Sequence, residues 1–237
     1  MPDEQEIVVV TILKDALLFF RDYFRPIMML TLMINVPFSL VIGLERLAKL
    51  PDILNSFLLY LSIGYSFLVF PYAMAVHVKL YSQIALEGEY DIRECLIYAR
   101  DHYGPFLFAS LCSIAIIFIG FILLIFPGII VSVLLSLFPF FMIFEQMEPI
   151  EALKKSVSVA KYHFWKIFGP TFAVQLMIMI VTLSGPFASK SRGIHIYLAS
   201  VFVDLATTLL SWLCVIILFR VYYIHRSSQE ENRENSD

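Results

Sequence analysis

The residues best placed to do chemistry are polar side chains inside long apolar stretches. Asp204 is the only acid well inside such a stretch. A carboxyl group at membrane depth is costly and faces a helix-bundle interior or a water-filled cavity, where it can relay a proton or a cation. The alternative is a structural aspartate bonded to a neighbouring helix or to the hydroxyls of Thr207 or Thr208. We favour the structural interpretation, because no basic residue lies at similar depth to pair with Asp204.

Two amides and one acid-base pair are further candidates. Asn35 and Gln175 fall near the middle of two other apolar stretches. Amides at that depth usually hydrogen-bond between helices, and a substrate contact is the alternative. His77 and Glu145 follow two similar Phe-Pro motifs near one membrane boundary, where they could form a pH-sensitive contact. Ordinary boundary residues are the favoured interpretation, since boundaries tolerate polar side chains.

Motifs for catalysis are missing from the sequence. It contains no G-x-S-x-G, no H-E-x-x-H and no nucleotide-binding glycine pattern. Its three cysteines, Cys95, Cys112 and Cys214, have no metal-ligand spacing. The net charge of −3 gives no electrostatic support for a nucleic-acid partner. We therefore expect no enzyme activity, no catalytic residue, no cofactor and no metal site.

The stretch from Phe106 to Phe144 organises the rest of the chain. It holds no charged residue and is long enough to cross a bilayer twice, since one crossing takes about 20 residues. Pro127 and Gly128 lie near its middle, and this pair predicts the turn of a helical hairpin. In hydrocarbon the backbone must satisfy its own hydrogen bonds, and the sequence lacks the alternation of a barrel, so helices are predicted.

The whole composition agrees with a membrane protein. Of the 237 residues, 59% are hydrophobic and only 16% are charged, against about 25% in a soluble domain. We predict an all-α integral membrane protein, a bundle of six transmembrane helices in one domain over residues 1–225. The six spans are expected at about 26–44, 55–78, 105–126, 129–144, 167–187 and 196–219.

Three amphipathic segments precede pairs of spans. Apolar residues recur at helical spacing in 5–25, 87–103 and 148–166, which predicts interfacial helices lying on the bilayer. The polar tail 226–237 is expected to be disordered.

Short matching motifs suggest a three-fold parallel repeat of surface helix, span, reversal and span. Arg21–Pro26 resembles Arg100–Pro105, and the Phe-Pro motifs at Pro71 and Pro139 occupy matching places in the second and fourth spans. These two prolines are expected to kink their helices. All three interfacial helices then lie on one side of the membrane.

The distribution of Lys and Arg predicts the orientation. Only Arg46, Lys49, Lys190 and Arg192, four of 17 basic residues, lie on the side opposite the amphipathic segments. The remaining 13 (17 − 4) place that side, with both termini, in the cytoplasm.

Part of the sequence resembles a known bacterial family. The resemblance rests on Pro127-Gly128-Ile129-Ile130, Phe138-Pro139, Glu145, Ala152-Leu153-Lys154-Lys155-Ser156 and Phe164-Trp165. This block resembles the YciC-like family of uncharacterised inner-membrane proteins, and a related arrangement occurs in the membrane domain of some glycerophosphodiester phosphodiesterases. The resemblance implies a bacterial inner-membrane location and about six spans, and brings no catalytic residues.

Two functions follow as hypotheses. The first is a non-enzymatic envelope protein whose surface helices hold membrane lipids or a protein partner, and which organises the bilayer. The second is a small transporter or permease that uses Asp204, Asn35 and Gln175. A membrane-embedded enzyme is the weakest alternative. A shared cavity at these three residues would favour ligand handling, whereas a sealed core would favour the scaffold.

Overall fold

The computed structural model describes residues 4–47, 52–188 and 194–234, and all of its elements in these ranges are helices. The prediction of an all-helical chain is confirmed. The helices are α1 Glu4–Asp22, α2 Phe24–Leu47, α3 Asp52–Leu86, α4 Ile92–Asp101, α5 Tyr103–Leu123, α6 Ile125–Leu135, α7 Phe138–Phe144, α8 Pro149–Tyr162, α9 Phe164–Ala188 and α10 Ile194–Glu234.

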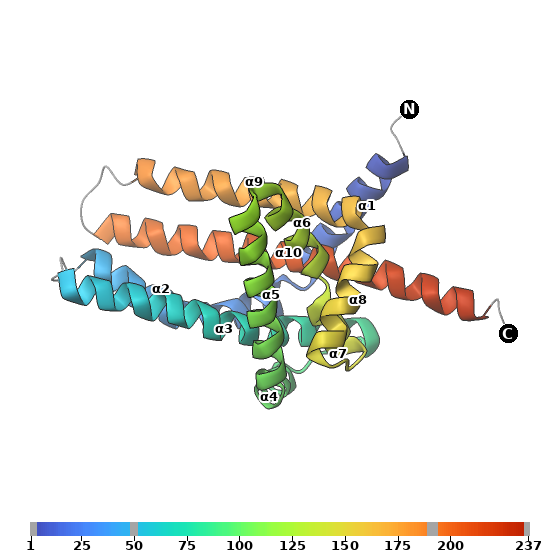
Figure 1. Cartoon of the computed structure of the whole chain (residues 1–237). Helices are drawn as coiled ribbons and strands as arrows, with labels where there is room; N and C mark the ends of the chain where they lie inside the picture. The colour runs from blue at the N-terminus through green and yellow to red at the C-terminus, as the bar shows by residue number, and fades with distance from the viewer. Residues whose placement is uncertain (1–3, 48–51, 189–193, 235–237) are drawn as a thin grey trace.

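Four long helices, α2, α3, α9 and α10, run side by side (Figure 1). The end of α2 and the start of α3 lie at the same end of this set as the end of α9 and the start of α10. The start of α1 and the end of α10 lie at the opposite end. At 1.5 Å per residue, the 35 residues of α3 and the 41 of α10 are longer than a bilayer core of about 30 Å. Both helices are therefore longer than a single crossing needs.

Five of the predicted spans correspond to helical stretches that are long and apolar enough to cross a membrane. The first predicted span, 26–44, falls in α2, and its apolar part is described over Phe24–Val36. The protein is thus a multi-pass helical membrane protein, and the count of six crossings remains a prediction. The five stretches are Ser56–Leu86, Tyr103–Leu123, Ile125–Phe144, Phe164–Leu183 and Val201–Gln229.

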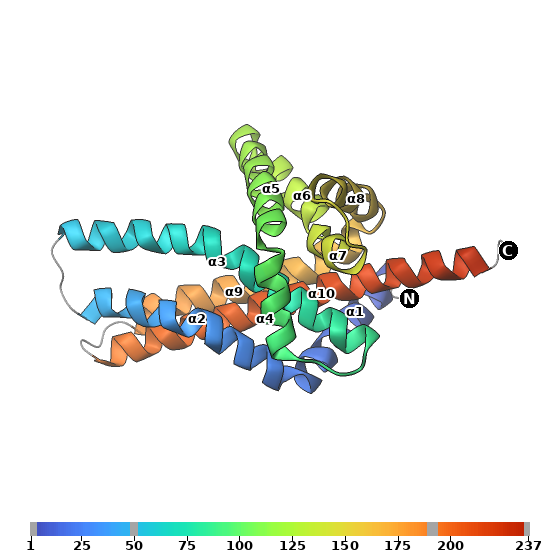
Figure 2. The ribbon, with the colours of Figure 1, turned by 90° about the horizontal axis from the view of Figure 1, so that it is seen from below.

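The hairpin of α5 and α6 runs across the four long helices instead of alongside them (Figures 1 and 2). Its tip projects from the side of the molecule, away from the ends where the other helix pairs reverse. Large side chains at the tip are exposed, among them Phe118, Ile122 and Phe126. The middle pair of helices is therefore not arranged like the first and last pairs, and the three-fold repeat gains no support from this arrangement.

The hairpin is present, but its turn lies before the predicted residues. α5 ends at Leu123, Leu124 is extended, and α6 begins at Ile125. Pro127 and Gly128 lie inside the first turn of α6, where a missing N–H is harmless. Placing the turn at these two residues was wrong. Gly128 serves close packing, because a β-carbon there would lie 2.6 Å from the ring of Phe121.

The fourth predicted span is broken between Leu135 and Phe138. α6 ends before this break and α7 begins after it, with Pro139 in the first turn of α7. Pro139 therefore stands at a helix start, and the prediction of a kink within a continuous helix was wrong. Pro71, by contrast, lies inside α3 as expected.

The three amphipathic segments fold as α1, α4 and α8, with their apolar sides against protein. Ile12, Ala16 and Phe19 of α1 are buried, and α1 packs on α2, α9 and α10. The predicted segment 5–25 also contains the first residues of α2. Cys95 and Ala99 of α4 are likewise buried, as are Leu153 and Ala160 of α8, so these apolar residues face the protein core and not lipid.

The polar tail differs from its prediction. α10 continues to Glu234, so residues 226–234, expected to be disordered, are helical, and 235–237 lie outside the described residues. A helix that is already formed extends at little cost, and Glu, Gln and Arg are good helix formers. This accounts for the continuation of α10 past its apolar part.

Candidate functional site: an uncharged cavity between the helices

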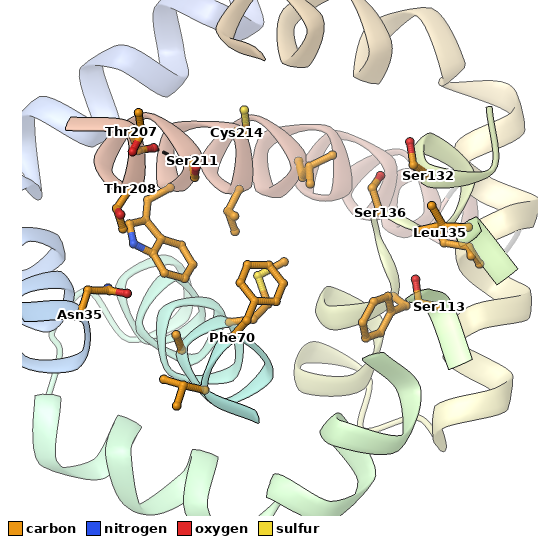
Figure 3. Close-up of a pocket in the computed structure, with 18 of the residues that line it drawn as sticks. Asn35, Phe70, Ser113, Ser132, Leu135, Ser136, Thr207, Thr208, Ser211 and Cys214 are labelled. Atoms are coloured by element: carbon orange, nitrogen blue, oxygen red, sulfur yellow. Dashed lines mark hydrogen bonds between the residues drawn. The ribbon is translucent and has the colours of Figure 1, made fainter. Parts of the chain in front are cut away.

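A cavity of about 530 Å³ lies where the crosswise α5 and α6 meet α2, α3 and α10 (Figure 3). Its walls are mainly apolar, with hydroxyl and amide groups set among them, and no charged side chain lines it. The lining residues are Asn35, Tyr65, Val69, Phe70, Ala73, Met74, Ser113, Ile117, Ser132, Leu135, Ser136, Phe138, Thr207, Thr208, Ser211, Trp212, Cys214, Val215 and Leu218.

The polar groups of the cavity lie deep in the apolar segments. Asn35 and Thr207 are close to the midpoints of the predicted spans 26–44 and 196–219, and Tyr65 is close to that of 55–78. In Figure 3 Thr207, Thr208 and Ser211 come from α10 and Asn35 from α2. Polar side chains at this depth are expensive and are often functional. The cavity is therefore the candidate functional site.

Most of the hydroxyl groups around the cavity already donate a hydrogen bond to a backbone carbonyl of the protein. The hydroxyl of Tyr65 donates to the carbonyl oxygen of Ile34 at 2.6 Å. The serine and threonine hydroxyls donate to backbone carbonyls three or four residues earlier in their own helices, at 2.7–3.0 Å. Their oxygens can still accept hydrogen bonds from a ligand. The residues that donate in this way are Ser132, Ser136, Thr207, Thr208 and Ser211.

The two amides predicted as candidates line adjoining cavities. The Nδ2 of Asn35 donates to the carbonyl oxygen of Thr31 at 3.0 Å, a bond within its own helix and not between helices. Gln175 lines a second cavity of about 450 Å³. The two cavities share the residues Ser132, Ser136, Cys214 and Leu218. The interior is thus not sealed, but the three candidates Asp204, Asn35 and Gln175 do not line one shared cavity.

Asp204 is not among the lining residues of either cavity. Its backbone carbonyl accepts hydrogen bonds from Thr207 at 3.0 Å and from Thr208 at 2.7 Å. The structural interpretation expected the hydroxyls of Thr207 and Thr208 to bond to Asp204. In the structure they bond to its main chain. The structure therefore places Asp204 one turn away from the cavity wall that Thr207 and Thr208 form.

His77 and Glu145 have separate surroundings. His77 is fully buried, and its ring is stacked on that of Trp212, with 3.5 Å between centroids. Glu145 caps the end of α7, where Lys155 forms an ion pair with it and the hydroxyl of Tyr222 donates to it at 3.2 Å. The structure does not bring His77 and Glu145 together.

Trp212 is the cavity residue that the sequence reasoning missed. It is 4% exposed, and its indole Nε1 has no hydrogen-bond partner among the described residues. A tryptophan inside an apolar span, away from the interfaces where tryptophan usually lies, was the available signal. Buried indole N–H groups usually find a partner, so this one marks the site.

Metal ligands are not gathered at the cavity or elsewhere in the described ranges, where no three His, Cys, Asp or Glu residues lie close enough together to hold an ion. The groups that line the cavity offer hydrogen bonding and apolar contact. Such a site suits an uncharged, mainly apolar ligand.

Comparisons with known proteins point to a membrane family. Over 111 residues the chain is 29% identical to UPF0259 membrane proteins of Buchnera aphidicola subsp. Acyrthosiphon pisum, strains Tuc7, 5A and APS. The match covers 46% of this chain and 43% of those relatives, so the chain spans less than half of their length. It supports the resemblance to YciC-like proteins. The comparisons give no support for the link to phosphodiesterases.

Neither family profiles nor solved structures extend this similarity. No protein-family profile matches the chain, and no solved structure is significantly similar to it. What the comparisons and the fold establish together is a multi-pass helical membrane protein similar to UPF0259 membrane proteins.

Proposed function

We propose that this chain is a non-enzymatic membrane protein that binds a neutral, mainly apolar molecule from the bilayer in the cavity between α2, α3, α5, α6 and α10. The observation that carries the proposal is the cavity itself. Its volume falls within the range of small-molecule sites, about 300–1,000 Å³, and no charged side chain lines it. An ion or a charged metabolite would lose its hydration in such a site without a compensating partner.

The proposal includes the position in the membrane. The four long helices cross the bacterial inner membrane, with both termini and the helices α1, α4 and α8 on the cytoplasmic side. The excess of Lys and Arg on that side supports this orientation.

Native mass spectrometry of the detergent-extracted protein tests ligand binding. Ser211 lines the cavity, and Ser211→Phe places a large ring in it. We expect this variant to retain several-fold less co-purified lipid than the wild type. Thr182→Phe, at an exposed threonine of α9 that lines neither cavity, is the matched control. Equal lipid retention by both variants would reject the cavity as the binding site.

The surface of α8 supports a second part of the proposal, contact with anionic lipid headgroups or with a protein partner. Lys154 and Lys161 flank a shallow hollow on this helix, together with Val157, Ser158 and Tyr162. Changing both lysines to glutamine should reduce the retention of anionic phospholipid and leave neutral lipid unchanged. If anionic lipid retention does not fall, the headgroup contact is wrong, and cross-linking to a partner at Ser158→Cys then tests the protein alternative.

A small transporter is the second candidate, because Asn35 and Gln175 line two cavities that share four lining residues. Binding sites near the midplane are typical of secondary transporters. If Asp204 couples transport to protons, proteoliposomes loaded with a pH-sensitive dye should show a proton flux that Asp204→Asn abolishes. A full flux in the variant would remove the relay, and no flux in the wild type would leave the binding function alone.

A further inference from the structure

The indole of Trp212 is held as an unpaired donor at the cavity. Only 4% of the side chain is exposed, and Nε1 has no partner among the described residues. An indole N–H can only donate a hydrogen bond, and a buried donor without an acceptor costs about 1–3 kcal/mol. Trp212 lines the cavity, so a molecule there that brings an acceptor atom against the edge of the indole would recover this cost.

His77 fixes the orientation of that donor. The imidazole lies parallel to the indole, with an interplanar angle of 9°. The Nδ1 of His77 is 2.8 Å from the carbonyl oxygen of Ala73, so the imidazole is itself tied to α3. Since His77 is completely buried, Trp212 cannot turn away without opening the packing between α3 and α10. The orientation of the indole ring is therefore fixed before a ligand arrives.

The rest of the wall offers mainly acceptors. Six hydroxyl groups around the cavity already donate to backbone carbonyls of the protein. A complementary ligand has a carbonyl oxygen for Trp212 and can bring hydroxyl hydrogens for the serine and threonine oxygens. Hydrocarbon alone would leave the indole N–H unpaired.

Depth excludes a charged headgroup at this point. Trp212 precedes Arg220 by eight residues, which is about 12 Å along a helix. A phosphate drawn that far into an uncharged cavity would lose its hydration without a counter-ion. A neutral lipid with an ester group can enter.

We propose that the cavity selects neutral lipids that carry a carbonyl group, and that the indole N–H of Trp212 donates the hydrogen bond that recognises this carbonyl. The inference rests on the proposed function, since it names the class of ligand that the cavity binds. His77 acts as a positioning residue behind Trp212.

One pair of probes isolates the carbonyl. Oleoylglycerol has an ester carbonyl, and the oleyl ether of glycerol has the same chain and the same hydroxyls without that carbonyl. We expect native mass spectrometry of the wild type to show about three- to tenfold tighter binding of the ester, the range of one hydrogen bond between neutral groups. Trp212→Phe keeps an aromatic ring on His77 but removes the donor, so the two probes should bind it equally.

Controls keep this result distinct from that of the proposed function. Trp165 is exposed and lies outside both cavities, so Trp165→Phe should preserve the preference for the ester. Equal binding of the two probes by the wild type would overturn the recognition of a carbonyl while leaving lipid binding intact. Failure of both probes to bind the wild type would instead count against the proposed function. A preference for the ester that persists in Trp212→Phe would assign the recognition to another group.

Discussion

The hydroxyl of Ser156 on α8 accepts a hydrogen bond from the backbone amide of Leu137, at 3.1 Å, and donates one to the carbonyl oxygen of Leu134, at 2.7 Å. Both backbone groups lie at the break between α6 and α7, where the helical hydrogen bonds stop. Ser156 is fully buried, so water cannot replace it. One side chain of α8 thus allows the broken span to be packed inside the protein.

Ser156→Ala is therefore expected to destabilise the protein. The substitution leaves the amide of Leu137 and one acceptor site of Leu134 unpaired in a buried place, at a cost of about 1–3 kcal/mol. Ser158→Ala, at an exposed serine of the same helix, should have no measurable effect. Thermal unfolding in detergent micelles measures both. Equal melting temperatures for the two variants would contradict the role of Ser156.

The hairpin of α5 and α6 gives a second prediction. A β-carbon added to Gly120 would lie 3.0 Å from the Cα of Gly128, closer than backbone atoms can accommodate without moving. Gly120→Ala should therefore lower the free energy of unfolding by about 1–3 kcal/mol, because the two helices are forced apart. At Gly104 an added β-carbon has open space around it, so Gly104→Ala in the same helix should be neutral or slightly stabilising. The same unfolding measurement tests the pair, and a stable Gly120→Ala protein would show that the helices do not pack this closely.

Hydropathy predicted the membrane segments because it depends only on local composition. Five of the predicted spans coincide with apolar helical stretches that are long enough to cross a membrane, one of them broken between α6 and α7. The turn at Pro127 and Gly128 was misplaced for an equally local reason. Proline occurs both in turns and in the first turn of a helix, and residues 125–128 fit either. The sequence alone does not choose between these two uses.

The crosswise direction of α5 could not be predicted, since contacts between distant segments determine it. The hydroxyl of Tyr103 at the start of α5 donates to the carbonyl oxygen of Leu68 in α3 at 2.8 Å. The hydroxyl of Tyr72 in α3 donates to the carbonyl oxygen of Leu96 in α4 at 3.2 Å. Neither pair has a signal in a single sequence. The cavity depends on this crossing, so its position was hidden even though Asn35 and Gln175 were recognised as candidates.

A third prediction concerns the junction of α3 and α4, which is organised by the buried amide of Gln83. Its Nε2 donates to Glu94 at 2.8 Å, and its Oε1 accepts from the Asp91 amide at 3.2 Å and from the thiol of Cys95 at 3.1 Å. Gln83→Leu removes all three bonds and should release the start of α4. Arg93→Ala, at an exposed residue of α4, is the control.

Modification of Cys95 measures this release. Burial raises the pKa of the Cys95 thiol to about 12, so the native thiol stays protonated and reacts slowly. With Cys112 and Cys214 changed to alanine, maleimide should label Cys95 at least about tenfold faster in Gln83→Leu, since a tenfold change corresponds to about 1.4 kcal/mol of easier local opening. Equal labelling rates in Gln83→Leu and Arg93→Ala would show that Gln83 does not hold the junction.

The stability of the fold is expected to depend on pH through His163, which links α8 and α9. Burial lowers the pKa of His163 below its usual value, with further lowering by the nearby charge of Lys166 and by His225, whose ring lies 5.6 Å away. The unfolded chain, with a pKa of about 6.5, then binds a proton more readily than the folded one. The stability that neutral His163 contributes is therefore present above about pH 6.5 and is lost as the pH falls from there through the lower folded pKa. Melting temperatures measured from pH 7.5 to pH 5 should fall less for His163→Gln than for the wild type. Ser158→Ala, at an exposed serine of α8 without a titratable group, should follow the wild type. Identical profiles for all three proteins would show that His163 is not destabilised by protonation.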